Sequence, residues 1–161
     1  MHTDLWNFAI TLYARPGVEA ACLNLQAQGA DVCLLLCAAW LDSRQIRLED
    51  PRVEQLRRLA GPWQHDVVQP LRELRRQWRA KAQHDAELAV LREQVKGLEM
   101  NAERQLLERL QLACEGWQRN LPGIQQDWLE ALTPTSARLH HDALQVLRAA
   151  VRSTQDAVDG D

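Results

Sequence analysis

Apolar residues recur along this chain at intervals of three and four, which is the spacing of one face of an α-helix. The alternation of apolar and polar residues that is typical of a strand is almost absent. Most Pro and Gly residues fall between the periodic segments and mark their ends. The pattern predicts helical segments over about 5–14, 17–28, 32–41, 50–60, 63–83, 86–117, 124–132 and 133–152, of which 50–60 and 124–132 are short. We therefore expect an all-α fold, an irregular bundle of about six or seven helices.

The segment 32–41 is apolar on every side and follows Asp31, a residue type that caps helices. A buried strand is conceivable for so short an apolar run. Leu, Ala and Cys outnumber β-branched residues in it, however, which favours a helix. We interpret this segment as a central helix at the hub of the core.

Two longer segments predict an antiparallel helical hairpin. The first covers 63–83 and should bend at Pro70, while the second covers 86–117, with apolar residues in heptad spacing and then in steps of four. The apolar stripe thins around His84, which favours a turn there over one very long helix. Gly97 lies inside the second helix at a cost of about 1 kcal/mol relative to Ala, and close packing against another helix would account for it.

We expect one domain over 1–152, with compact amino-terminal helices in 1–60, the hairpin in 63–117 and carboxy-terminal helices in 124–152. Residues 153–161 form an acidic stretch that resembles a frayed tail. The chain has 161 residues, a length typical of one domain, and 46% of them are apolar, enough for a sizeable core.

The net charge of −3 argues against indiscriminate nucleic-acid binding, yet the charge is unevenly distributed. Residues 42–81 carry ten basic and six acidic side chains, between acidic neighbours. Within this quarter, four arginines fall at i, i+3, i+4 and i+7 and so share one helical stripe: Arg72, Arg75, Arg76 and Arg79. A second stripe beside it is apolar and includes Trp78.

The arginine stripe has three interpretations: it is a solvated helix face, it pairs within the chain, or it binds a partner. An antiparallel hairpin would lay Glu87, Glu93 and Glu99 along it, and the arginines would then pair within the chain. Alternatively, the stripe binds a partner, since Arg suits bidentate recognition of carboxylate or phosphate. The candidate partner-binding residues are Arg72, Arg75, Arg76, Arg79 and Trp78, with Arg57 and Arg58 as extensions.

Other chemistry is weakly indicated. The six tryptophans are scattered singly and are interpreted as anchors of the core and of helix contacts.

Four cysteines lie in apolar surroundings without disulfide or metal-site spacing, and no nucleotide-binding or hydrolase motif occurs. We therefore expect no catalytic residue, cofactor or metal. The lack of a signal peptide or a long apolar run predicts a cytoplasmic protein that does not enter membranes.

The amino-terminal motif Leu5-Trp6-Asn7-Phe8-Ala9, followed by segments 12–19 and 29–41, resembles a family of small proteobacterial proteins that share a domain of unknown function. Segments 67–72 and 91–99 carry the same resemblance, which covers roughly residues 4–115. The resemblance implies a bacterial cytosolic all-α protein and implies no activity.

We expect a non-enzymatic protein-interaction or adaptor protein that binds an acidic partner through the arginine-rich face. The first alternative is an RNA- or DNA-associated protein that uses the same stripe. The second is an enzyme whose site is spread over several helices. The heptad spacing suits a dimer as well as an intramolecular hairpin, so the oligomeric state stays open.

Overall fold

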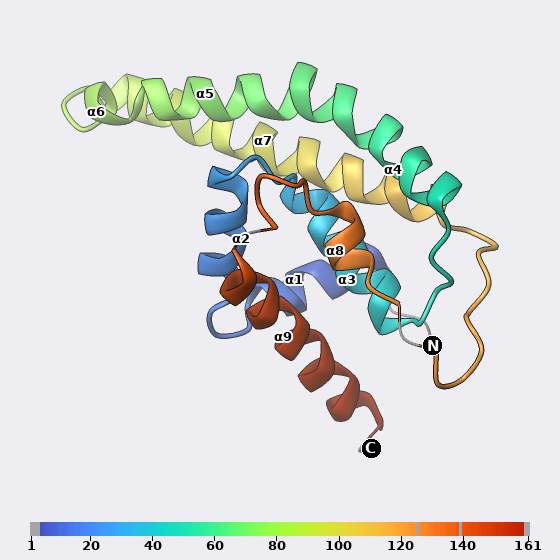
Figure 1. Ribbon diagram of the computed structural model, residues 1–161. Coiled ribbons are helices and arrows are strands. Elements are labelled where there is room, and N and C mark those ends of the chain that lie inside the picture. The colour runs from blue at the N-terminus through green and yellow to red at the C-terminus, as the bar shows by residue number, and fades with distance from the viewer. Residues whose placement is uncertain (1–3, 125, 139, 160–161) are drawn as a thin grey trace.

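The computed structural model describes residues 4–124, 126–138 and 140–159 and is built from helices (Figure 1). In chain order they are α1 (Leu5–Tyr13), α2 (Val18–Ala27), α3 (Val32–Ser43), α4 (Asp50–Trp63), the π-helical segment η1 (Gln64–Val68), α5 (Gln69–Gln77), α6 (Arg79–Ala82), α7 (Ala86–Ala113), α8 (Trp128–Leu132) and α9 (His141–Asp159). No strand occurs in these ranges. The predicted all-α class is confirmed.

Helix α3 is the centre of the body, as predicted. Every side chain from Cys33 to Leu41 is buried. Helices α1, α2, α8 and α9 pack around it, and α4 and α7 pack against it from a further side (Figure 1). A carboxylate oxygen of Asp31 accepts the backbone N–H groups of Cys33 at 2.9 Å and Leu34 at 3.3 Å, so this helix begins with the expected cap.

The chain does not break at Gly61-Pro62, and the prediction of two separate helices on either side is wrong. Helix α4 continues through Pro62 to Trp63 and runs through η1 into α5. The irregularity instead lies one turn before Pro70, where the N–H of Gln69 donates to the carbonyl of Gln64, five residues back. Pro70 lacks an N–H and crowds the preceding turn, and the wider π turn accommodates it.

Helices α5, α6 and α7 form the predicted antiparallel hairpin, with its turn at 83–85. Asp85 caps α7 by accepting the N–H of Leu88 at 3.1 Å. The helix α7 ends at Ala113, four residues before the predicted end at Trp117. A Cβ atom added at Gly97 would meet no described atom within 4 Å. The expectation that close helix packing accounts for Gly97 is therefore wrong.

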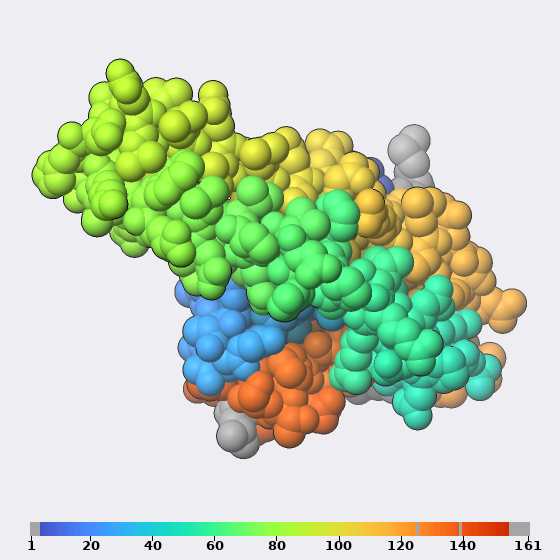
Figure 2. Space-filling view, turned by 90° about the horizontal axis from the view of Figure 1, so that it is seen from above, coloured from blue at the N-terminus to red at the C-terminus, as the bar shows by residue number. Residues whose placement is uncertain are grey.

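The inner part of the hairpin lies across the body, whereas the outer part extends past it. Figure 1 shows α6 and the start of α7 beyond α2, and Figure 2 shows the same segment as a lobe that stands clear of the amino-terminal and carboxy-terminal helices. We call residues 76–98 the hairpin tip.

The carboxy-terminal part departs most from the predicted boundaries. Helix α8 begins at Trp128 rather than near residue 124, and α9 begins at His141 rather than near Thr133. Thr133 is extended and its hydroxyl donates to the carbonyl of Leu129, which ends α8 there. Helix α9 continues to Asp159 through most of the predicted tail. Leu139, which its spacing places on the apolar face of the predicted helix 133–152, lies outside the described residues.

The tryptophans anchor helices to one another, as their scattered positions predicted. Trp128 is fully buried, stacks on Trp117 with ring centroids 5.8 Å apart and donates its indole N–H to the carbonyl of Ile46. Trp63 joins α4 to α7 through an indole hydrogen bond of 2.9 Å to the carbonyl of Ala102. Arginine guanidinium groups lie over four of the rings: those of Trp6, Trp40, Trp63 and Trp117.

Candidate interaction site on the hairpin

The arginine stripe is divided between two roles, because its members face different surroundings. Arg72 and Arg75 turn toward the body and α7, where their side chains are only 12% and 25% exposed. Arg76 and Arg79 are exposed on the hairpin tip. The single stripe in the sequence thus becomes one buried pair and one exposed pair.

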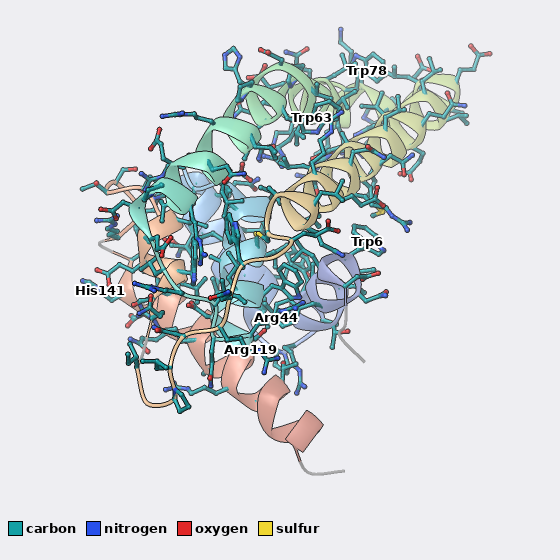
Figure 3. The ribbon with its side chains drawn as sticks, turned by 90° about the vertical axis from the view of Figure 1, so that its right-hand side faces the viewer. Trp6, Arg44, Trp63, Trp78, Arg119 and His141 are labelled. Carbon is teal, nitrogen blue, oxygen red and sulfur yellow. The ribbon has the colours of Figure 1, made fainter. Side chains whose placement is uncertain are left out.

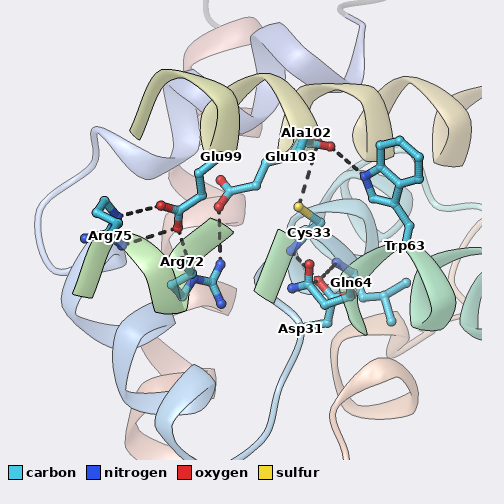
Figure 4. Close-up of polar contacts among 10 residues, drawn as sticks. Asp31, Cys33, Trp63, Gln64, Arg72, Arg75, Glu99, Ala102 and Glu103 are labelled. Carbon is cyan, nitrogen blue, oxygen red and sulfur yellow. Dashed lines mark hydrogen bonds and ion pairs between the residues drawn. The ribbon is translucent and has the colours of Figure 1, made fainter. Parts of the chain in front are cut away.

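The buried pair joins α5 to α7 through carboxylates (Figure 4). Arg72 donates from Nε to Glu99 at 3.1 Å and from Nη2 to Glu103 at 3.2 Å. Arg75 holds the same Glu99 through Nε at 2.5 Å. With the amide of Gln26 turned so that its oxygen faces Arg72, α2 also accepts two hydrogen bonds from this guanidinium. Arg72 therefore connects the hairpin to the body.

The electrostatics of this cluster follow from burial and pairing. Burial alone would raise the pKa of Glu99, but the hydrogen bonds from Arg75 and Arg72 outweigh it and hold this pKa below its ordinary value. Burial raises the pKa of Glu103, and the charge of Arg72 offsets only part of this. Burial also raises the pKa of Asp31 to about 6. In this cluster, the positive charges of the two arginines are therefore offset by carboxylates of the same chain.

The predicted pairing within the chain is therefore present for part of the stripe. Of the three glutamates expected beside the arginines, Glu99 forms ion pairs with them. Glu87 and Glu93 are exposed and have no cationic side chain within ion-pair distance in the described chain. Glu103 lies one turn beyond Glu99 on the same helix face, as the i, i+4 spacing indicates, and it pairs with Arg72 as well.

The exposed pair has no such partner. Within the described ranges, no carboxylate lies within ion-pair distance of Arg76, Arg79 or the neighbouring Lys81, all of which are exposed. Trp78 lies between the two arginines in sequence and is half-buried at the end of α5. The hairpin tip therefore presents cations that the fold itself does not use.

Arg57 and Arg58 are also exposed but belong to another region. Arg57 donates to the carbonyl of Ala131 in α8 at 2.6 Å, and Arg58 pairs with Glu54 at 3.5 Å on α4. They precede Arg76 by about 28 Å along the helix axis at 1.5 Å per residue. The structure does not bring them together with the exposed pair.

Apolar side chains are exposed on the tip as well. In the heptad pattern of α7, one row is represented by Val95 and Ala102, and both are buried. The other row contains Leu91 and Leu98, which are 49% and 55% exposed. One half of the coiled-coil seam is used inside the chain and the other half is left in solvent. Sequence spacing identified the seam but could not show which row is covered.

The cysteines and histidines offer no site comparable to the tip. All four cysteines are free and buried, and burial raises the pKa of Cys22 to about 12, which suppresses thiolate chemistry. His65 pairs with its exposed neighbour Asp66 at 2.8 Å. The described residues contain no group of three His, Cys, Asp or Glu side chains arranged to hold a metal ion.

Two pockets escaped sequence reasoning because helix ends and loops that are far apart in the sequence build them together. One contains Asp42, whose oxygens accept the N–H groups of Trp128 at 2.9 Å and Leu129 at 3.2 Å, and whose pKa burial raises to about 7. This carboxyl thus caps α8 from a distance of 86 residues in sequence. The other pocket contains Arg44. No sequence pattern links residues so far apart.

The fold and the site together define an all-α protein with a compact body and a projecting helical hairpin. The chain belongs to a family of proteins of unknown function, DUF2390, whose model matches residues 4–110. The match includes α5, α6 and most of α7 and confirms the resemblance to a domain of unknown function. No curated protein and no solved structure matches the chain. Among the described helices, none has both the length and the apolar composition required of a membrane span.

Proposed function

We propose that this protein is a non-enzymatic interaction or adaptor protein that binds an acidic protein partner through its hairpin tip. The observation that carries the proposal is the exposed pair Arg76 and Arg79, unpaired within the described chain, on a segment that stands clear of the body (Figure 2). Arg72 and Arg75 contribute to this site indirectly, because their hydrogen bonds hold the hairpin in place on the body.

The surroundings of the exposed arginines favour a protein over a nucleic acid. Leu91 and Leu98 are about half exposed on the same hairpin. Such side chains gain free energy when a protein surface covers them, whereas a phosphate backbone offers them no apolar contact.

We further propose that the protein acts in the bacterial cytoplasm. The four free, buried cysteines are suited to a reducing compartment, where thiols persist without forming disulfides.

Affinity capture from bacterial lysate, with and without nuclease, tests the binding surface. The variant Arg76→Glu/Arg79→Glu should lose a protein that the wild type retains after nuclease treatment. Arg47→Glu/Arg58→Glu is the matched control, with the same two charge reversals at exposed arginines whose ion pairs lie at the surface away from the hairpin tip, and it should retain that protein. Because Arg72 and Arg75 hold the fold, they are left unchanged.

A second variant separates the apolar from the charged contribution. Leu91→Ser/Leu98→Ser should also weaken capture, since apolar residues near charged contacts contribute to protein interfaces. Capture that disappears with nuclease would favour the nucleic-acid alternative. Equal capture by the wild type and by the Arg76→Glu/Arg79→Glu variant would contradict the proposal.

A further inference from the structure

A pocket of about 260 Å³ lies where α3 and α7 end, on the far side of the body from the hairpin tip. The chain segments that leave these two helices are paired there, since the N–H of Arg47 donates to the carbonyl of Gln118 and that of Asn120 to the carbonyl of Gln45. This pairing fixes the pocket wall although both segments are loops.

Arg44 is one of the residues that line this pocket. Its guanidinium carbon lies 4.6 Å from the centroid of the Trp40 ring. Its Nε atom is buried without a hydrogen-bond partner among the described residues, and no described carboxylate lies within ion-pair distance. Stacking uses the face of a guanidinium and leaves its in-plane N–H groups for a bidentate acceptor.

A second donor lines the same pocket. The side-chain oxygen of Gln111 accepts the backbone N–H of Leu5 at 2.9 Å, which fixes the orientation of the amide. Its NH₂ group has no acceptor among the described residues. The pocket thus combines two donor groups that the described chain leaves without acceptors.

Positive charge is concentrated beside these donors. Arg44 and Arg119 lie close together in Figure 3, on the two paired segments. Burial, and then the positive charge of Arg119, lower the pKa of Arg44. A bound anion would counteract both effects on this pKa, because its negative charge and its acceptor oxygens favour the charged form of the guanidinium.

We infer that this pocket binds a small anion that carries a carboxylate or a phosphate group, held by the guanidinium of Arg44 and the amide of Gln111. The indole rings of Trp40 and Trp117 line the same space and suit a ligand with a small apolar part. This site is separate from the hairpin tip and does not depend on the function proposed for it.

A purely structural role for Arg44 makes a different prediction. The carbonyl ends of α3 and α7 meet at the pocket and attract a cation, and the exposed Glu115 also lines it. If Arg44 only offset these partial charges, its removal would destabilise the fold, and added anions would not change the Tm of the wild type.

Thermal unfolding with added anions tests the inference on the full chain. Sodium phosphate, sodium acetate and sodium benzoate are compared with sodium chloride at equal ionic strength. We expect at least one of the three to raise the Tm, because a ligand that binds only the folded state stabilises it. A response to phosphate alone indicates a phosphate ligand, and a response to acetate or benzoate indicates a carboxylate.

Two variants locate the site. Arg44→Gln removes the charge, and Gln111→Glu keeps the acceptor for Leu5 while replacing the amide donor by a negative charge. Each should weaken the affinity measured by calorimetry by about tenfold or more, since a charge-assisted hydrogen bond is lost or opposed. Arg152→Gln, at an exposed arginine of α9 beside the other pocket, is the control and should bind like the wild type.

The inference is overturned if none of the three anions raises the Tm of the wild type relative to chloride. It is also overturned if both Arg44→Gln and Gln111→Glu respond to the anion as the wild type does. Gln111→Glu keeps the test decisive even if Arg44→Gln fails to fold.

Discussion

Glu99 shows how one residue can decide the role of its neighbours. Its carboxylate is 8% exposed and binds both Arg72 and Arg75. Without it, two guanidinium groups would remain in a largely buried position with too few acceptors. Removing one partner of a buried ion pair is far more costly than removing one partner at the surface.

We therefore expect Glu99→Gln to lower the free energy of unfolding by about 3 kcal/mol. Glu108→Gln is the matched control, because it is the same substitution on the same helix and removes the exposed pair with Arg104 at 3.2 Å. That change should cost no more than about 0.5 kcal/mol. Urea denaturation followed by circular dichroism measures both, and equal losses would contradict the account of the cluster.

Asp42 predicts the pH dependence of stability. Burial raises its pKa from 3.8 in the unfolded reference to about 7 in the folded protein. The folded state therefore binds the proton more tightly, and the resulting stability is complete below pH 3.8 and is lost as the pH rises through 7. Asp31, with its pKa raised to about 6, contributes in the same direction.

The free energy of unfolding measured by denaturation should consequently fall between about pH 4 and pH 7, because over this interval the folded state binds protons that the unfolded state has already released. In Asp42→Asn, the free energy of unfolding should fall less steeply with pH. The substitution also changes the cap of α8, but that effect is the same at every pH. A slope that is unchanged in Asp42→Asn would show that another group is responsible.

At the scale of the elements, the sequence predicted the helices best where local signals were strong. Asp31 and Asp85 cap the helices that the pattern placed after them, and the start of α7 at Ala86 matches its prediction. Local signals were insufficient at Gly61-Pro62. There the buried residues Leu56, Ala60 and Val68 and the hydrogen bond of Trp63 hold one continuous helical path through a proline.

The site was predictable in the same limited way. Helical spacing placed four arginines on one stripe, and the hairpin placed Glu99 beside them. It could not separate the buried pair from the exposed pair, because this depends on where the body ends beneath the hairpin. The pockets of Arg44 and Asp42 depend on loops that meet across the fold, and no periodic pattern marks such meetings.

Gly97 offers a direct test of the helix itself. The position is helical and a Cβ atom there would face open space. Gly97→Ala should therefore raise the free energy of unfolding by about 1 kcal/mol, the propensity difference between the two residues. Gly29→Ala should have the opposite sign because Gly29 has a φ of 97°. Destabilisation by Gly97→Ala would indicate a contact at this surface.

The two rows of α7 should differ in what they contribute to stability. Leu106 is fully buried, and Leu106→Ala should lower the free energy of unfolding by about 2–5 kcal/mol. Leu98 is 55% exposed, and Leu98→Ala should change it by less than about 0.5 kcal/mol. Chemical denaturation compares the two identical substitutions directly. A large loss in Leu98→Ala would mean that its row is covered in solution.

On the scale of the whole molecule, the fold separates a stable body from a projecting arm. Helix α3 and its surrounding helices supply most of the buried apolar side chains. The hairpin is attached to this body through the cluster of Arg72 and Glu99 and through the hydrogen bond of Trp63. It is also attached through the buried leucines of α7, which are Leu106, Leu107 and Leu110. Its tip contributes little to the core, and its exposed cations and leucines are consequently available for binding.

The most direct test of this account is photocrosslinking from two matched positions. A photoreactive amino acid replaces Gln94 on the hairpin tip or Gln55 on α4, both exposed glutamines on helices. We predict a nuclease-resistant protein adduct from position 94 that is absent from position 55. The same adduct from both positions, or an adduct from position 55 alone, would contradict the proposal that the tip is the binding surface.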